Sequence, residues 1–112
     1  MKIDERSVGN VTILDISGQI KLSQGDMMLK DKIHSVVHQG QKNILVNLAK
    51  VDYVDSAGLG EIISSHTTVT RAGGKMKLLN LTKKMRDLLS ITKLLTVFET
   101  FDSEQEAVKS FS

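Results

Sequence analysis

An aspartate and a serine lie side by side in the segment Asp55-Ser56-Ala57-Gly58-Leu59-Gly60, and their types and spacing suit chemistry better than any other residues here. A buried strand is predicted to end near Ala49 and a helix to begin at Ser56, which places Asp55 and Ser56 at a strand-to-helix corner. Such corners often carry the sites of α/β folds. The unpaired N–H groups and the dipole at a helix start accept an anion such as a phosphate.

A phosphate on Ser56 would leave the helix start intact while adding about −1.5 to −2 charge to the surface. A partner that fits the bare helix end would then have to oppose this dianion. Gly58 and Gly60 are expected to keep the first turn free of bulky side chains. The alternative is that Asp55 or Ser56 serves only as an N-cap, because short polar residues are favoured there. The segment alone leaves both interpretations open.

Catalytic readings of the same segment fit less well. The hydrolase motif G-x-S-x-G requires glycine two residues before the serine, and Val54 stands there instead. The dinucleotide motif G-x-G-x-x-G fails because Ile63 occupies the place of its third glycine. We therefore expect no enzyme and no bound cofactor.

The three histidines do not complete a catalytic or metal centre in the sequence pattern. His34 and His38 stand four apart on a predicted helix, but the glutamate of H-E-x-x-H is absent between them and no third ligand is evident. His66 falls on the apolar stripe of another predicted helix. All three are expected to be ordinary helix residues, and no metal is expected.

The composition of the 112 residues, 40% of them hydrophobic, suits one core and predicts a single domain over residues 1–112. The absence of cysteine excludes disulfides, cysteine metal sites and cysteine nucleophiles, and is consistent with a reducing cytoplasm. The sequence has no apolar leader pattern at its start and no run of eighteen apolar residues. We expect a cytoplasmic protein that is not inserted in a membrane.

The formal net charge of +2 is too small to indicate nucleic-acid binding, although the charges are uneven. From Arg71 to Lys93 there are seven Lys or Arg against a single acid, Asp87. These cations fall on several predicted elements, and no aromatic residues are interleaved with them for base stacking. A solvated basic surface is expected rather than a nucleic-acid or membrane module.

Strand and helix patterns alternate along the chain. Gly9-Asn10 separates two strand-like runs and predicts an opening β-hairpin. Ser103 and Glu106 stand in capping-box register at the start of a final helix. The predicted strands cover residues 2–8, 11–16, 44–49, 75–81 and 96–101, and the predicted helices cover 29–37, 56–72, 83–91 and the residues from 103 onward. This order predicts an α/β fold: a mixed sheet of about five strands, opened by the hairpin, with about four helices and with 44–49 mid-sheet.

The segment from Val51 to Gly60 resembles the signature of STAS domains, the anti-sigma factor antagonist family, and the element order matches that family over essentially the whole chain. The resemblance implies that Ser56 is phosphorylated by an anti-sigma factor that is also a serine kinase. It further implies that the unphosphorylated protein binds this anti-sigma factor and frees a sigma factor. A PP2C-type phosphatase would restore the binding form.

We also expect a partner surface. It comprises the start of the second helix around Asp55 to Glu61, the neighbouring loop near Gly18 to Gln24 and the exposed part of the third helix, and only the first of these rests on the motif match. The family often carries an acidic residue where this chain has Lys21. We hypothesise that Lys21 belongs to the partner-binding set and steadies a phosphate on Ser56. A different reading within the family is a scaffold or regulatory module that binds another signalling partner or a nucleotide without sigma-factor control.

Overall fold

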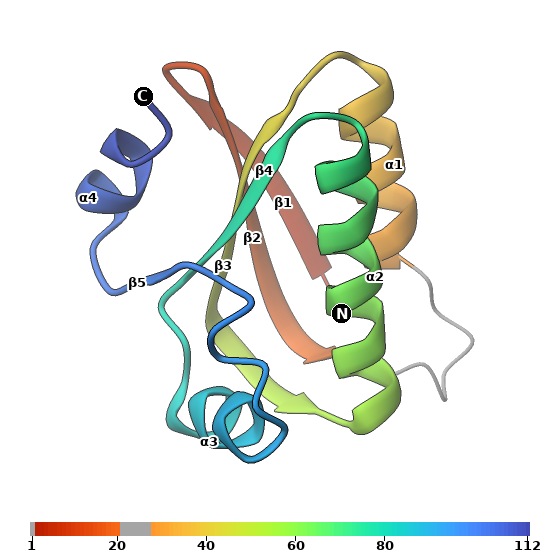
Figure 1. Ribbon diagram of the computed structural model, residues 1–112, viewed down its shortest axis with the longest axis vertical. Coiled ribbons are helices and arrows are strands. Elements are labelled where there is room, and N and C mark those ends of the chain that lie inside the picture. The colour runs from red at the N-terminus through yellow and green to blue at the C-terminus, as the bar shows by residue number, and fades with distance from the viewer. Residues whose placement is uncertain (1, 21–27) are drawn as a thin grey trace.

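A sheet with the strand order β1-β2-β3-β4-β5 organises the chain (Figure 1). The computed structural model describes residues 2–20 and 28–112. Five strands and four helices lie within these residues, as the sequence predicts. In chain order they are β1 (Lys2–Val8), β2 (Val11–Ile20), α1 (Met28–His38), β3 (Asn43–Val54), α2 (Ser56–Arg71), β4 (Lys75–Leu79), α3 (Lys83–Ile91), β5 (Thr100–Phe101) and α4 (Glu104–Lys109).

The opening hairpin supplies the antiparallel pair of the sheet. β1 pairs with β2 from Lys2 opposite Ser17 to Val8 opposite Val11, and Gly9 takes a positive φ of 60° in the turn between them. β2–β3, β3–β4 and β4–β5 are parallel pairs. Parallel neighbours need a crossover, and α1, α2 and α3 each lie between two such strands in the sequence. The predicted mixed α/β sheet is confirmed.

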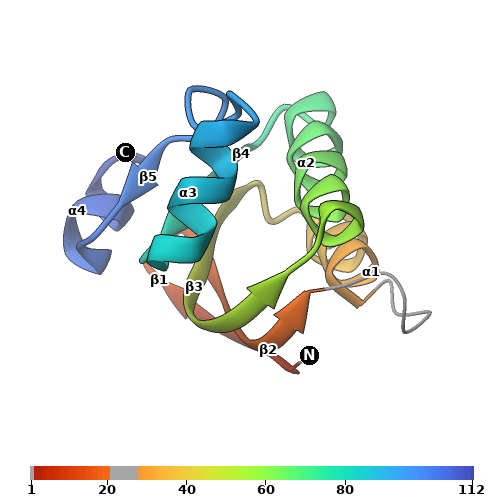
Figure 2. The same ribbon diagram turned by 90° about the horizontal axis from the view of Figure 1, so that it is seen from below.

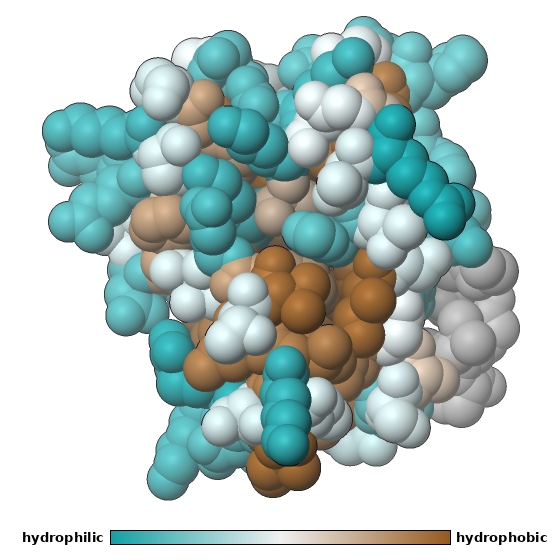
Figure 3. Space-filling view, in the orientation of Figure 1, coloured by the Kyte–Doolittle hydropathy of each residue, from teal (hydrophilic) through white to brown (hydrophobic). Residues whose placement is uncertain are grey.

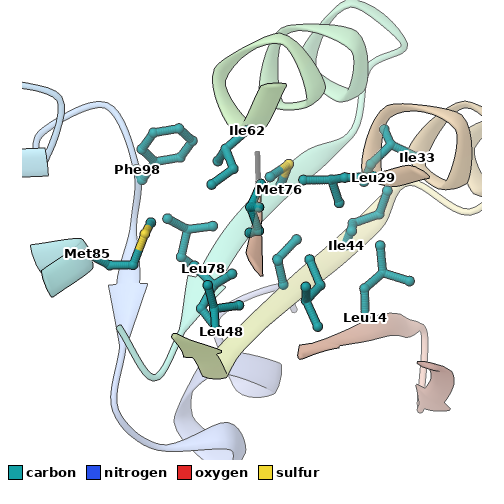
Figure 4. Close-up of a cluster of buried hydrophobic side chains, with 14 of the residues drawn as sticks. Leu14, Leu29, Ile33, Ile44, Leu48, Ile62, Met76, Leu78, Met85 and Phe98 are labelled. Atoms are coloured by element: carbon teal, nitrogen blue, oxygen red, sulfur yellow. The ribbon is translucent and has the colours of Figure 1, made fainter. Parts of the chain in front are cut away.

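The helices form layers on the two faces of the sheet. α1 and α2 cover one face, while α4 lies on the opposite face near β4 and β5 (Figures 1 and 2). Side chains alternate between the faces of a strand, so the central strand β3 contributes to two cores. Figure 4 shows Leu14, Ile44 and Leu78 of the sheet meeting Ile33 of α1 and Ile62 of α2. The smaller core under α4 consists of Val11, Ile13, Leu45, Leu79, Ala107 and Phe111.

Two strands are shorter than the sequence predicts. The last strand was expected over residues 96–101, but β5 contains only Thr100 and Phe101. The preceding chain turns instead, because the Val97 N–H donates to the Leu94 carbonyl at 3.0 Å, and the Phe98 side chain, 4% exposed, enters the core. β4 stops before Asn80, whose φ of 57° is incompatible with an extended strand.

Two other strands are longer than predicted. β2 continues to Ile20 and β3 to Val54, beyond the apolar runs that predicted them. The extensions pair with each other, with Gly18 opposite Val51 and Ile20 opposite Val54. Backbone pairing therefore carries both strands past the end of their hydrophobic pattern and toward the first turn of α2. Among the described residues, no helix is long and apolar enough to cross a membrane.

Candidate functional site

Asp55 is the N-cap of α2. Its backbone is extended, with φ −93° and ψ 178°, and its Oδ1 accepts a hydrogen bond from the Gly58 N–H at 2.7 Å. The Leu59 N–H donates to the Asp55 carbonyl at 2.9 Å and begins the helical hydrogen bonds. Ser56 is therefore the first helical residue, as the sequence predicts. The predicted N-cap role is confirmed for Asp55. The Ser56 hydroxyl is not the group that caps the helix.

The first turn of α2 divides into an exposed and a buried side. Ser56, Ala57 and Gly60 are exposed, whereas Gly58 and Leu59 are buried against the rest of the fold. A reagent or protein that approaches this end of the helix meets Ser56 and Ala57 first. The positive end of the helix dipole lies in the same turn. The turn thus combines an accessible hydroxyl with a local field that favours an anion.

The two glycines of this turn have different environments. A Cβ atom at Gly58 would lie 1.9 Å from the Ile20 carbonyl oxygen, which is closer than non-bonded atoms can approach. A Cβ atom at Gly60 would meet nothing within 4 Å. The sequence expectation that both residues must be small holds sterically for Gly58. Gly60 is not required for packing.

The end of β2 lies directly beside the start of α2. The Asp55 N–H donates to the same Ile20 carbonyl at 3.4 Å, so one backbone oxygen contacts both the cap residue and the first turn. This contact places Ile20 beside the residues that flank Ser56. Lys21, the remaining residue of the predicted partner-binding set, lies outside the described residues, as do residues 22–24 of the loop predicted from Gly18 to Gln24.

A hollow of about 260 Å³ lies beside the same corner, between the end of β3 and α3. Its lining is mostly apolar and is contributed by Val51, Asp52, Tyr53, Val54, Thr82, Lys84, Met85 and Leu88. We call these residues the α3 groove. The sequence indicated only that the exposed part of the third helix contributes to a surface. The hollow itself was missed, because the strand end and the helix that form it are separate in the sequence.

The histidines occupy structural positions. His34 and His38 are exposed on α1, and the described residues contain no group of three His, Cys, Asp or Glu that could hold a metal ion. The His66 ring packs edge-on against Phe98, with 5.0 Å between ring centroids and an interplanar angle of 75°. Such an aromatic contact fixes the segment before β5 against α2.

The basic residues between positions 71 and 93 do not share one environment. Lys77 is 6% exposed, and its Nζ donates to the carbonyl and hydroxyl oxygens of Ser110, both at 3.0 Å, beneath α4. Arg86 lies 3.6 Å from a carboxylate oxygen of Asp102, and both side chains are largely exposed. Lys83 and Lys84 are exposed in the first turn of α3. Lys77 therefore does not belong to a solvated basic surface, whereas Lys83, Lys84 and Arg86 are exposed to solvent.

A network of ion pairs lies away from α2, at Arg6 on β1. Its guanidinium donates to both carboxylate oxygens of Asp15, at 2.6 and 3.2 Å, and to both of Glu104 on α4. These hydrogen bonds hold the pKa values of Asp15 and Glu104 below their usual range and raise the pKa of Arg6. Asn47 donates a further hydrogen bond to Asp15 at 2.8 Å. The network ties the hairpin to α4 and was not apparent from the sequence.

Known proteins are similar to this chain in both sequence and fold. The chain is 22% identical over 108 residues to the anti-sigma F factor antagonist of Paenibacillus polymyxa. The aligned residues cover 96% of this chain and 92% of the relative. It is 28% identical over 99 residues to the anti-sigma-B factor antagonist of Bacillus subtilis, covering 88% and 89% of the two chains.

Solved structures agree with the architecture described above. The Bacillus cell fate determinant SpoIIAA in its phosphorylated form superimposes with a TM-score of 0.76 at 19% identity, covering 99% of this chain and 100% of the other. An anti-sigma factor antagonist from Mycobacterium paratuberculosis gives a TM-score of 0.81 at 17% identity, covering 98% and 92%. These likenesses establish the fold. The model of the STAS domain matches residues 2–107, and the chain therefore belongs to the STAS domain family.

Proposed function

We propose that this protein is an anti-sigma factor antagonist whose binding is switched by phosphorylation of Ser56. The observation that carries the proposal is the exposed Ser56 hydroxyl at the first helical position of α2, directly after the Asp55 cap. The names of the relatives support the sigma-factor circuit. SpoIIAA has been solved in both phosphorylated and unphosphorylated forms, which supports a phosphorylation switch on this fold.

The proposed cycle runs between two partners in the cytoplasm. The unphosphorylated protein binds an anti-sigma factor with serine kinase activity, and the sigma factor is released. Transfer of a phosphoryl group to Ser56 ends this binding, and a PP2C-type phosphatase removes the group again. The protein itself performs no catalysis and needs no cofactor. Its partner-binding residues are Asp55, Ser56, Ala57, Gly58, Leu59 and Gly60, with Lys21 in the adjoining loop.

The environment of Ser56 explains how a phosphate could block binding without unfolding the chain. Asp55 already satisfies the Gly58 N–H, so the helix start does not depend on the serine side chain. A phosphate on Ser56 would lie near the Asp55 carboxylate. It would add about −1.5 to −2 charge to the negative charge already present at this turn. A partner surface that matches the bare turn would have to desolvate this concentrated negative charge, which costs binding free energy.

The test uses the purified protein with anti-sigma factor recovered from the native cell extract, with and without ATP. Ser56→Ala should abolish phosphorylation and keep binding, and Ser56→Asp should weaken binding on the order of tenfold, about 1.4 kcal/mol. Ser90→Ala, at an exposed serine on α3, is the matched control and should be phosphorylated like the wild type. Mass spectrometry that finds undiminished phosphate on the Ser56→Ala variant would refute the assignment.

A further inference from the structure

The α3 groove is a concave apolar surface beside Ser56. Val51, Met85 and Leu88 line its floor and wall, and its volume of about 260 Å³ is enough for a few side chains of a partner. Seen from below, α3 lies beside the end of β3, next to the first turn of α2 (Figure 2). A ligand that enters the groove would therefore contact the same corner of the molecule as a partner at Ser56.

The apolar surface continues past the groove along α3. Lys84, Leu88 and Ile91 stand at i, i+4 and i+7, so they share one face of the helix. The first two line the groove, and Ile91 extends it with a side chain that is 79% exposed. Figure 3 shows hydrophobic side chains gathered beside α3, over the segment that follows it, where Val97 is 46% exposed. A contiguous exposed apolar patch of this kind is typical of an interaction site.

Cations surround this apolar surface. Residues 83–93 contain Lys83, Lys84, Arg86 and Lys93 against the single acid Asp87. Lys83 and Lys84 occupy the first turn of α3, which has no acidic residue, although the positive end of the helix dipole disfavours cations there. The stability of α3 therefore does not account for them. Asp52 in the groove lining offsets Lys84 locally, but Lys83, Lys84 and Lys93 together outnumber Asp52 and Asp87, which favours a negatively charged ligand.

We propose that the α3 groove binds an acidic amphipathic helix of a protein partner. Apolar side chains of the partner helix would enter the groove and cover Leu88 and Ile91. Carboxylates that flank them on the partner helix would face Lys83 and Lys84. The inference rests on the proposed function on one point, that the partner is a protein. It adds the kind of element by which that partner is recognised, at a surface that Ser56 does not form.

The other occupants fit the groove less well. Among the described helices of this chain, α1 presents a mixed surface and α3 is basic. The single acid of α2, Glu61, is buried, and Glu104 of α4 is engaged by Arg6, so these helices of a second copy offer no acidic amphipathic face. An anionic membrane would match the cations, but a bilayer is flat and the groove is hollow. A helix with projecting side chains matches both the charge and the shape.

The probe is a fluorescein-labelled synthetic helix of about 18 residues with leucine at i, i+3, i+4 and i+7 and glutamate on both flanks. A matched peptide carries lysine in place of every glutamate. Fluorescence anisotropy should show saturable binding of the glutamate peptide and at least about tenfold weaker binding of the lysine peptide. Lys84→Glu and Ile91→Ser should each weaken the binding of the glutamate peptide by about tenfold. Both variants should still fold, because both side chains are exposed and neither supports the core.

Two substitutions away from the groove serve as controls. Lys109→Glu changes an exposed cation on α4, and Val8→Ser changes an exposed apolar residue in the hairpin; both should bind within about twofold of wild type. Circular dichroism establishes that every variant folds. Equal affinity for the two peptides, or unchanged binding by Lys84→Glu and Ile91→Ser, overturns the proposal.

The same variants distinguish an acidic helix from a membrane or a second copy as the occupant of the groove. They also test the groove independently of the Ser56 switch. Binding of phosphatidylserine vesicles but not of the glutamate peptide, lost in Lys84→Glu, would replace the proposal with a membrane surface. Self-association lost in Ile91→Ser, without peptide binding, would replace it with a dimer interface. Failure of peptide binding while Ser56 is still phosphorylated rejects the groove alone, whereas peptide binding without Ser56 phosphorylation rejects the switch alone.

Discussion

The α-carbon of Gly58 packs against the carbonyl group of Ile20, so that a Cβ atom at position 58 would lie 1.9 Å from the carbonyl oxygen and 2.7 Å from its carbon. Both neighbours are backbone atoms, which cannot rotate away as a side chain can. The start of α2 is thus held against the end of β2 without any side chain between them. This close approach fixes the position of Ser56 relative to the sheet.

Gly58→Ala should destabilise the protein, because the added methyl group forces α2 and β2 apart. An increase in side-chain size at a packed position typically costs about 1–3 kcal/mol in the free energy of unfolding, and a backbone clash lies at the upper end. Gly60→Ala is the matched control: it is exposed and unobstructed, and alanine at a helix position should stabilise by up to about 1 kcal/mol. Urea denaturation measures both. A neutral Gly58→Ala would contradict the packing argument.

Asp55→Ala should shorten or loosen the start of α2, because the Gly58 N–H loses its acceptor. Loss of an N-cap lowers the free energy of unfolding by about 0.5–2 kcal/mol. Asp55→Asn keeps an acceptor oxygen and should recover most of the stability. Hydrogen exchange of the amides of residues 56–59 reports the local effect. Equal protection in Asp55→Ala and wild type would show that the cap is dispensable.

Arg6→Met should remove part of the acid sensitivity of the fold. The hydrogen bonds from Arg6 lower the pKa values of Asp15 and Glu104 from ordinary values of 3.8 and 4.5. A carboxyl with a lowered folded pKa stabilises the fold above its unfolded value, and this contribution is lost as the pH falls through the folded pKa. The free energy of unfolding should therefore drop with decreasing pH below 4.5, less steeply in the variant.

The matched control for Arg6 is Lys2→Met, which removes a more exposed ion pair on the same strand, between Lys2 Nζ and Asp4 at 3.8 Å. At neutral pH the Arg6 variant should lose only about 1 kcal/mol, since all three groups of its network are partly exposed and screened by solvent. Chemical denaturation between about pH 2.5 and 7, a range that includes the titration of the carboxyls, gives both slopes. If the free energy of unfolding fell equally steeply with decreasing pH in Arg6→Met and in wild type, the proposed effect of Arg6 on the acid sensitivity of the fold would be contradicted.

Lys77→Met should weaken the attachment of α4 to the sheet. The buried Lys77 ammonium binds both oxygens of Ser110 and lies 4.6 Å from the centroid of the Phe111 ring. Methionine keeps the apolar stem and leaves the Ser110 carbonyl without this donor, at a cost of about 1–3 kcal/mol. Lys75→Met, at an exposed lysine on the same strand, should change stability by less than about 0.5 kcal/mol. Thermal unfolding that ranks the two variants equally would contradict the proposed attachment.

Local patterns predicted the elements that local interactions create. The start of α2 at Ser56 was placed by the preceding acid and the apolar period. One of the two hydrogen bonds of the predicted capping box is present, from the Glu106 N–H to Ser103 Oγ at 3.3 Å. The hairpin followed from its Gly-Asn turn. In each case the interacting residues lie within a few positions of one another, so their spacing in the sequence is enough to predict the contact.

The features that escaped prediction depend on residues far apart in the chain. The sequence around Gly58 cannot reveal that the Ile20 carbonyl approaches it, because the parallel pairing of β2 and β3 brings them together. The α3 groove likewise needs the end of β3 and α3 in their final positions. β5 was overestimated because the run from Thr96 has strand-like composition, while burial of Phe98 requires the chain to turn.

The contact between Arg6 and Glu104 has a consequence for the order of folding. The two residues are separated by 98 positions, so β1 cannot complete its ion pairs until α4 has been synthesised. The hairpin pairs residues that are close in the sequence, so its two strands can pair before the contact with α4 exists. Because Arg6 joins β1 to α4, opening of one element should ease the opening of the other by the contribution of this network, about 1 kcal/mol.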